Sequence, residues 1–179
     1  NSITGQVEGL GGSDSHWLPA LNAPSYWDAS AEYATTRYAQ SSVMGGSSLW
    51  TDNSDGTFTQ IGSYFRNLAG LSYLDLYVMG LLAPEEVPDT FLLKDMVSVG
   101  SSRFRATRVP VRIQDIVAAE GPRVPTSANS QKVFRLGVYL LYDPSGAPST
   151  AMKARTEAFV QSLIHYFDHA SGGRTRVVQ

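Results

Sequence analysis

A long amphipathic helix near the C-terminus restricts the folds open to this chain of 179 residues. Ser149 or Thr150 can cap its first turn and Gly172-Gly173 can end it. Its apolar stripe consists of Met152, Thr156, Phe159, Val160, Leu163, Ile164 and Phe167, and its polar row of Lys153, Glu157, Gln161 and His165. Such a stripe has to be buried against a sheet or another helix.

The elements before this helix predict strands as well as helices. Alternating residues predict a strand from Arg103 to Ile113, at a sheet edge because Pro110 cannot donate a ladder hydrogen bond. The nearly apolar run from Val133 to Tyr142 predicts a buried central strand. Shorter helices are expected from Leu71 to Leu82 and from Gln114 to Glu120. We therefore predict an α+β fold, with a central helix and a small sheet covered by the long C-terminal helix.

Residues 1–62 differ from the rest because they are rich in Ser, Gly, Asn, Asp and aromatic residues. Asp52-Asn53-Ser54-Asp55-Gly56 resembles half of a calcium-binding loop, but the required first position falls on Thr51 and the distal Glu is missing. We favour a hairpin from Trp50 to Ile61 with Asp55-Gly56 as its turn. The chain is expected to be one domain or a fragment, in which residues 1–62 line a cleft and residues 63–179 form a helix plus an α/β subdomain.

Composition limits the classes of partner. With 42% apolar residues the chain can bury a core, and 16 acidic against 14 basic residues leave a net charge of -2. This balance argues against non-specific binding to nucleic acid or to a membrane surface, and no apolar run is long enough to span a bilayer. Without cysteine, disulfides and thiolate metal sites are excluded. Four arginines along the strand indicate a solvated outer face: Arg103, Arg105, Arg108 and Arg112.

The chain has three histidines, and these and one aspartate, Asp75, are the first candidates for functional residues. His165 and His169 lie on one helical face, yet His165 continues the polar row and His169 suits the dipole of the last turn, so we expect no metal there. His16 precedes Trp17 in a Gly- and Ser-rich segment and is a candidate to line a cleft. Ser72 followed by Asp75 is a capping-box pattern, and in one conformation the Asp75 carboxylate cannot both close that box and bind a metal.

Several strings resemble a group of large, secreted bacterial zinc metallopeptidases. The most specific of them is Leu74-Asp75-Leu76-Tyr77-Val78-Met79-Gly80-Leu81. The others are Ser42-Val43-Met44-Gly45-Gly46, residues 50–58, 84–88 and 113–117, Gly121-Pro122-Arg123-Val124-Pro125, residues 131–135 and 172–174. In that group a His-Glu-x-x-His helix lies upstream of a His-Trp dipeptide, which is followed by the Val-Met-Gly segment.

The resemblance implies a zincin-like C-terminal subdomain of a secreted or periplasmic endopeptidase that acts on protein or peptide. Two histidines of the His-Glu-x-x-His helix would hold zinc and its Glu would act as the base. That motif does not occur in this sequence, and the chain opens with Asn1 instead of Met. We therefore expect the N-terminal part of the same protein to supply the motif, and the chain by itself to be catalytically incomplete.

Two residues are alternative third zinc ligands under this resemblance. His16, upstream of Met44, suits an order in which Ser42 to Gly46 form a methionine turn beneath the metal. Asp75 suits an order with an acidic ligand from a later helix, and is favoured because it lies in the most specific string. Tyr77 would assist oxyanion stabilisation, or would simply be a packed helical tyrosine. The alternative for the whole chain is a non-catalytic binding or structural module of a larger secreted protein.

Overall fold

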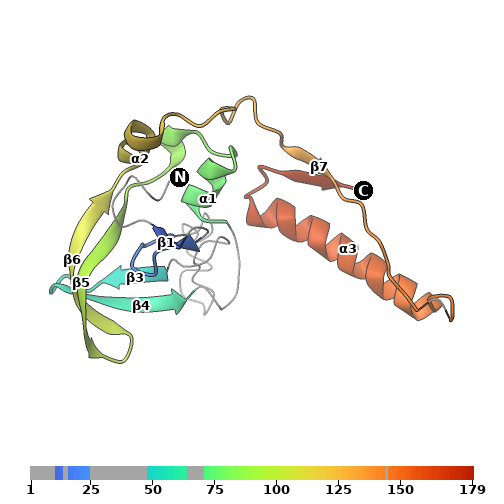
Figure 1. Ribbon diagram of the computed structural model, residues 1–179, viewed down its shortest axis with the longest axis horizontal. Helices are drawn as coiled ribbons and strands as arrows, with labels where there is room; N and C mark the ends of the chain where they lie inside the picture. The colour runs from blue at the N-terminus through green and yellow to red at the C-terminus, as the bar shows by residue number, and fades with distance from the viewer. Residues whose placement is uncertain (1–10, 14–15, 25–47, 64–70, 144) are drawn as a thin grey trace. The chain divides into compact units, whose positions relative to one another are not determined.

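The computed structural model describes residues 11–13, 16–24, 48–63, 71–143 and 145–179. The chain divides into two compact units, Asn1–Ser130 (unit 1) and Gln131–Gln179 (unit 2). Both units combine helices with strands, which confirms the predicted α+β class (Figure 1). The division into residues 1–62 and 63–179 stays a prediction.

Unit 1 is organised by a four-stranded antiparallel sheet in the order β3-β4-β6-β5. Its strands are β3 (Ser48–Asp52), β4 (Thr57–Ser63), β5 (Thr90–Gly100) and β6 (Arg103–Val111). The last two form the long hairpin coloured green to yellow in Figure 1. A separate two-stranded pair consists of β1 (Gly11–Ser13) and β2 (His16–Trp17).

A short segment, residues 20–23, pairs with both edge strands of this sheet. Leu21 forms an antiparallel bridge to Leu92 of β5, and Asn22 forms a parallel bridge to Ser48 of β3. The Leu93 amide donates to the carbonyl of Ala20 at 3.0 Å, and further hydrogen bonds join residues 21–23 to Ser48. The four strands and this segment therefore make a closed ring of hydrogen-bonded neighbours, in which the outer strands β3 and β5 each gain a partner on their second side.

Apolar side chains gather into two clusters, because successive residues of a strand point to opposite faces. The aromatic cluster contains Trp50, Phe58, Phe91 and Leu93, with Phe104 packed against it. The helix cluster contains Leu92 and Val111 of the same sheet together with the helices that follow it. Its further buried members are Trp17, Leu21, Leu71, Leu74, Leu76, Tyr77, Leu81, Leu82, Val87, Ile113 and Ile116.

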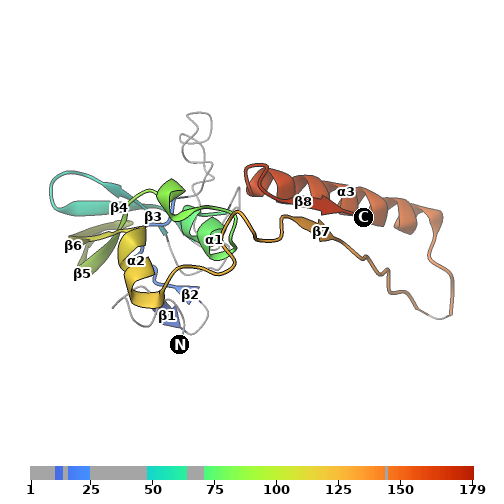
Figure 2. The same ribbon diagram turned by 90° about the horizontal axis from the view of Figure 1, so that it is seen from above.

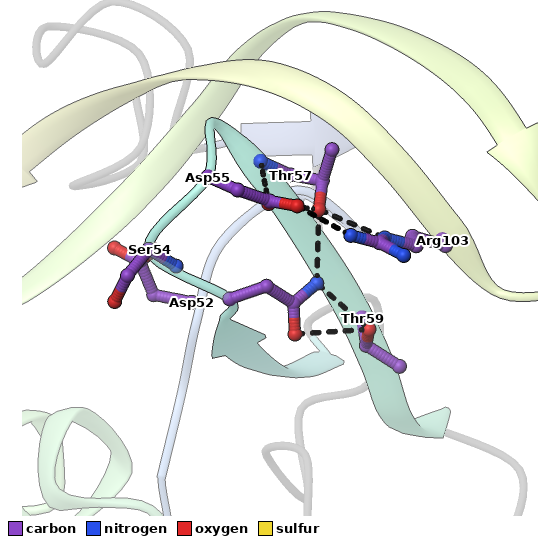
Figure 3. A network of polar contacts seen from close by, with 7 residues as sticks. Asp52, Ser54, Asp55, Thr57, Thr59 and Arg103 are labelled. Carbon is purple, nitrogen blue, oxygen red and sulfur yellow. Dashed lines mark hydrogen bonds and ion pairs between the residues drawn. The ribbon is translucent and has the colours of Figure 1, made fainter.

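The predicted hairpin is confirmed, with β3 and β4 joined by residues 53–56. Polar contacts among Asp55, Thr57 and Arg103 hold the turn (Figure 3). The Asn53 side-chain amide also donates to the hydroxyls of Thr57 and Thr59 at 3.1 and 3.0 Å. The Asp55 carboxylate accepts from the Thr57 amide at 3.0 Å and from Arg103 of the neighbouring strand at 2.5 Å. The segment that resembles half of a calcium loop is thus engaged in its own turn.

The strand predicted from Arg103 is present, and the four arginines are exposed, although Arg103 and Arg105 alternate in parity with Arg108 and Arg112 and so do not share one face. Its predicted edge position is wrong for residues 103–105, which pair with β4 on one side and β5 on the other. Farther along, Pro110 lies opposite Phe91, and no residue of β4 pairs with that part of β6 in the described ranges. Proline is tolerated there because its missing N–H faces away from the ladder with β5.

The predicted first helix is shorter than expected. Helix α1 covers Tyr73–Val78, capped at its start by Ser72, and the chain then turns at Gly80, whose φ is 77°. Leu81 and Leu82, each 2% exposed, are buried beyond the helix end, which explains why they continue the apolar period. A 3-10 turn, η2 (Pro84–Glu86), and helix α2 (Ile113–Glu120) complete unit 1, the latter one residue longer than predicted.

Unit 2 contains helix α3 (Thr150–Ala170) and a parallel pair of strands, β7 (Val133–Arg135) and β8 (Arg176–Val178). Figure 2 shows α3 beside β8. The helix confirms the sequence prediction, including its cap, since the Met152 amide donates to the Ser149 hydroxyl at 3.2 Å. Only part of the apolar stripe is covered: Val160 is 2% exposed, whereas Phe159 is 66% exposed.

The predicted buried central strand from Val133 to Tyr142 is wrong. Among its described residues only the first three form a strand, paired with β8, and Tyr139 and Leu141 are each 90% exposed. An apolar run becomes a central strand only when neighbours pair on both sides and layers cover both faces. Within the described part of unit 2, β7 has a three-residue strand on one side.

Candidate functional site

Asp75 lies in the first turn of α1 and is 2% exposed. Its amide donates to the Ser72 hydroxyl at 3.0 Å, and one carboxylate oxygen, Oδ2, accepts from the Ser72 amide at 3.2 Å. The other oxygen, Oδ1, accepts from the indole Nε1 of Trp17 at 3.3 Å. The capping box expected from the sequence is therefore formed, and both oxygens of the carboxylate accept hydrogen bonds.

Trp17 brings the second candidate ligand into the same region. It is 3% exposed in the helix cluster, and it follows His16 directly in β2, where His16 pairs with Ser13 through the backbone. The structure thus joins the strand that carries His16 to the helix that carries Asp75. No sequence pattern indicates this contact, because 58 residues separate Trp17 from Asp75.

Tyr77, on the same helix, is 4% exposed and belongs to the helix cluster. Its hydroxyl accepts from the Arg123 amide at 3.4 Å. The Arg123 side chain donates from Nε to the carbonyl of Val78 at 2.6 Å and from Nη1 to the carbonyl of Pro125. In this conformation Tyr77 is a packed helical tyrosine, and its assistance to an oxyanion stays a prediction.

These contacts bring three separate strings of the sequence together in unit 1. They are the His16-Trp17 dipeptide, the string from Leu74 to Gly80, and the string from Gly121 to Pro125. Nothing in the local sequence marks Arg123 as the residue that caps the carbonyl end of α1. Its guanidinium carries several donors and is therefore suited to the last carbonyls of a helix.

The residues that the structure describes do not by themselves fit a zinc site. A catalytic zinc needs three protein ligands and an open position, and among the described residues no three His, Cys, Asp or Glu side chains lie close enough together to hold a metal ion. Both oxygens of Asp75 are directed at N–H donors. Met44, the candidate for a methionine turn, lies outside the described residues, as do residues 25–47 around it.

His165 and His169 lie exposed on α3, with ring centroids 6.3 Å apart and the rings nearly parallel. His165 also borders an open groove between α3 and β8 that Asp168, Thr175 and Arg176 help to line. The predicted polar row is therefore at the surface of unit 2.

None of the described helices has the length and apolar content that a membrane span requires. No protein-family model, no curated protein and no solved structure matches this chain.

Proposed function

We propose that this chain is the C-terminal portion of a secreted zinc-dependent endopeptidase, completed by a His-Glu-x-x-His helix elsewhere in the same protein. The proposal is supported by one observation above the others: strings that carry the resemblance, and that are far apart in the sequence, contact one another. Trp17 reaches Asp75, and Arg123 reaches the end of the same helix. Side chains that line a cleft have to be held in position by contacts of this kind between separate segments.

In this proposal the chain provides one zinc ligand and holds it in position. The catalytic base is the Glu of the His-Glu-x-x-His helix. Zinc, when bound, would lower the pKa of a water molecule and polarise the scissile carbonyl. His16 and Asp75 are the alternative ligands, and unit 1 would hold either of them against the helix that carries the other two. Peptide or protein is the substrate class.

Metal content of the full-length gene product tests the proposal. We expect about one zinc ion per chain by elemental mass spectrometry, cleavage of a peptide library, and loss of both after chelation. His165→Ala is the matched control for His16→Ala, because it removes an exposed histidine from unit 2. A full-length protein that binds no zinc and cleaves no peptide would refute the proposal, and absence from the extracellular and periplasmic fractions would refute secretion.

A second candidate, a non-catalytic binding or structural module, is favoured by the engagement of Asp75. A carboxylate that closes a capping box and binds a buried indole has a sufficient structural role. Under this alternative the full-length protein is stably folded and zinc-free, and His16→Ala changes neither its thermal stability nor its metal content.

A further inference from the structure

The Asp75 carboxylate connects two parts of unit 1 that are far apart in the sequence. Its Oδ1 accepts from the Trp17 indole and its Oδ2 from the Ser72 amide, at 3.3 and 3.2 Å. Asp75 and Trp17 are 2% and 3% exposed, so water does not compete for these hydrogen bonds. The carboxylate therefore fixes Trp17 to the first turn of α1.

Zinc ligation would require a different arrangement of the same group. A ligand oxygen lies about 2.0–2.2 Å from the metal, and moving the carboxylate toward a metal would withdraw it from the buried indole N–H and the Ser72 amide. Each donor left without a partner in a dry environment carries a desolvation cost. The environment of Asp75 consequently favours a role as acceptor within the protein.

Trp17 connects Asp75 to β2, the strand that also contains His16. Strand β2 has only two residues, and within the described part of the chain it pairs with β1 alone. Such a short pair provides little stability by itself. Among the described residues, burial of the Trp17 ring in the helix cluster and its hydrogen bond to Asp75 therefore help to hold β2 in place.

We propose that Asp75 is a positioning residue and not a zinc ligand: its carboxylate anchors β2 through Trp17. This inference rests on the proposed function only for its effect on zinc binding. The link between Asp75 and Trp17 can be tested without zinc.

The first measurement is a double-mutant cycle on the full-length protein, with Trp17→Phe, Asp75→Ala and the double variant compared by thermal unfolding. We expect the decrease in Tm of the double variant to be clearly smaller than the sum of the two single decreases, because either change breaks the same hydrogen bond. Asp75→Asn replaces Asp75→Ala if the alanine variant does not fold.

Trp50→Phe is the matched control for Trp17→Phe. Trp50 is 5% exposed and its indole also donates one hydrogen bond, to the carbonyl of Pro19 at 3.0 Å, but it belongs to the aromatic cluster. Combined with Asp75→Ala, this change should lower the Tm additively. Additive losses for Trp17 and Asp75 as well would overturn the link between them.

The second measurement is the zinc affinity of the same variants. If Asp75 acts on the zinc site through Trp17, Trp17→Phe and Asp75→Ala should each weaken zinc binding by about 10- to 100-fold, whereas Trp50→Phe should leave it unchanged. If Asp75→Ala abolishes zinc binding while Trp17→Phe retains the wild-type affinity, Asp75 is the ligand and the inference is wrong. If the wild-type protein binds no zinc, the proposed function fails, and the Tm cycle alone decides whether Asp75 anchors β2.

Discussion

Gly80 is required by two independent features of its position. Its φ of 77° lies in the left-handed region, where a Cβ is unfavourable. A Cβ at this position would also lie 2.8 Å from Cζ of Arg123 and 3.0 Å from Cβ of Ser130. The guanidinium cannot simply move aside without losing its hydrogen bond to Val78. Glycine therefore allows the end of α1 and Arg123 to approach each other closely.

We predict that Gly80→Ala lowers the free energy of unfolding by about 2–5 kcal/mol, the sum of left-handed strain and local overpacking. Gly56→Ala is the matched control, because Gly56 has the same φ of 77° but a Cβ added there would meet no atom within 4 Å. It should cost only the strain, about 1–2 kcal/mol. Urea unfolding measures both, and equal losses for the two variants would contradict the close approach of Arg123.

Asp75 and Arg123 also show which contacts local sequence patterns do not predict. The Asp75 capping box was predictable because its partner, Ser72, is three residues away. Its contact with Trp17 and the contact of Arg123 with Val78 were not, because no local pattern indicates which distant side chain will reach a buried group. The candidate site could thus be named residue by residue, but its internal connections could not.

Among the elements, the β3–β4 hairpin shows how a polar turn can be fixed by its own side chains. The pKa of the Asp55 carboxyl is held below its ordinary value of 3.8, chiefly by the hydrogen bond from the Thr57 hydroxyl. The Thr57 amide and the Arg103 guanidinium lower it further. A carboxyl whose pKa is lower in the folded state stabilises the fold above its unfolded pKa, and this contribution is lost as the pH falls through the folded value. The hairpin is therefore expected to loosen only below about pH 4.

We predict that Thr57→Val raises the pKa of Asp55 toward its ordinary value, because the strongest donor to the carboxylate is removed. Thr59→Val is the matched control, since the Thr59 hydroxyl bonds to Asn53 and not to Asp55. A pH titration of the Asp55 carboxyl carbon by NMR measures the effect. An unchanged Asp55 titration in Thr57→Val would show that the Thr57 hydroxyl does not cause the shift.

For the whole molecule, the two units differ in how well they bury their apolar residues. Unit 1 has two clusters on the two faces of one ring of strands, and residues such as Leu76 are 0% exposed. Unit 2 leaves Phe159 and the run around Tyr139 and Leu141 exposed. Its stability consequently depends less on these side chains than their hydrophobicity alone would indicate.

We predict that Leu76→Ala lowers the free energy of unfolding by about 2–5 kcal/mol, as for other fully buried leucines. The same change at Leu141, which is 90% exposed, should stay within about 0.5 kcal/mol of the wild type. Denaturant unfolding of the two variants provides the comparison. A loss at Leu141 as large as at Leu76 would mean that the run from Val138 to Tyr142 is packed in solution.

The sequence alone determined the features that depend on neighbours within a few residues. These include the caps of α1 and α3, the turn of the β3–β4 hairpin, helix α2, the exposed arginines of β6 and the α+β class. For the caps and the turn, the partners lie within one helical turn or one hairpin, so their geometry follows from local spacing.

Tertiary structure decided the rest, because burial depends on which distant segments come together. Only the fold could show that residues 20–23 close the sheet into a ring, that Val133–Tyr142 lacks the neighbours of a central strand within the described residues, and that Trp17 reaches Asp75. Hydrophobicity indicates that burying a side chain lowers the free energy of the protein, but it does not specify which surface will cover that side chain. For Asp75, only the fold shows that its carboxylate accepts hydrogen bonds both from Ser72 nearby and from Trp17, 58 residues away.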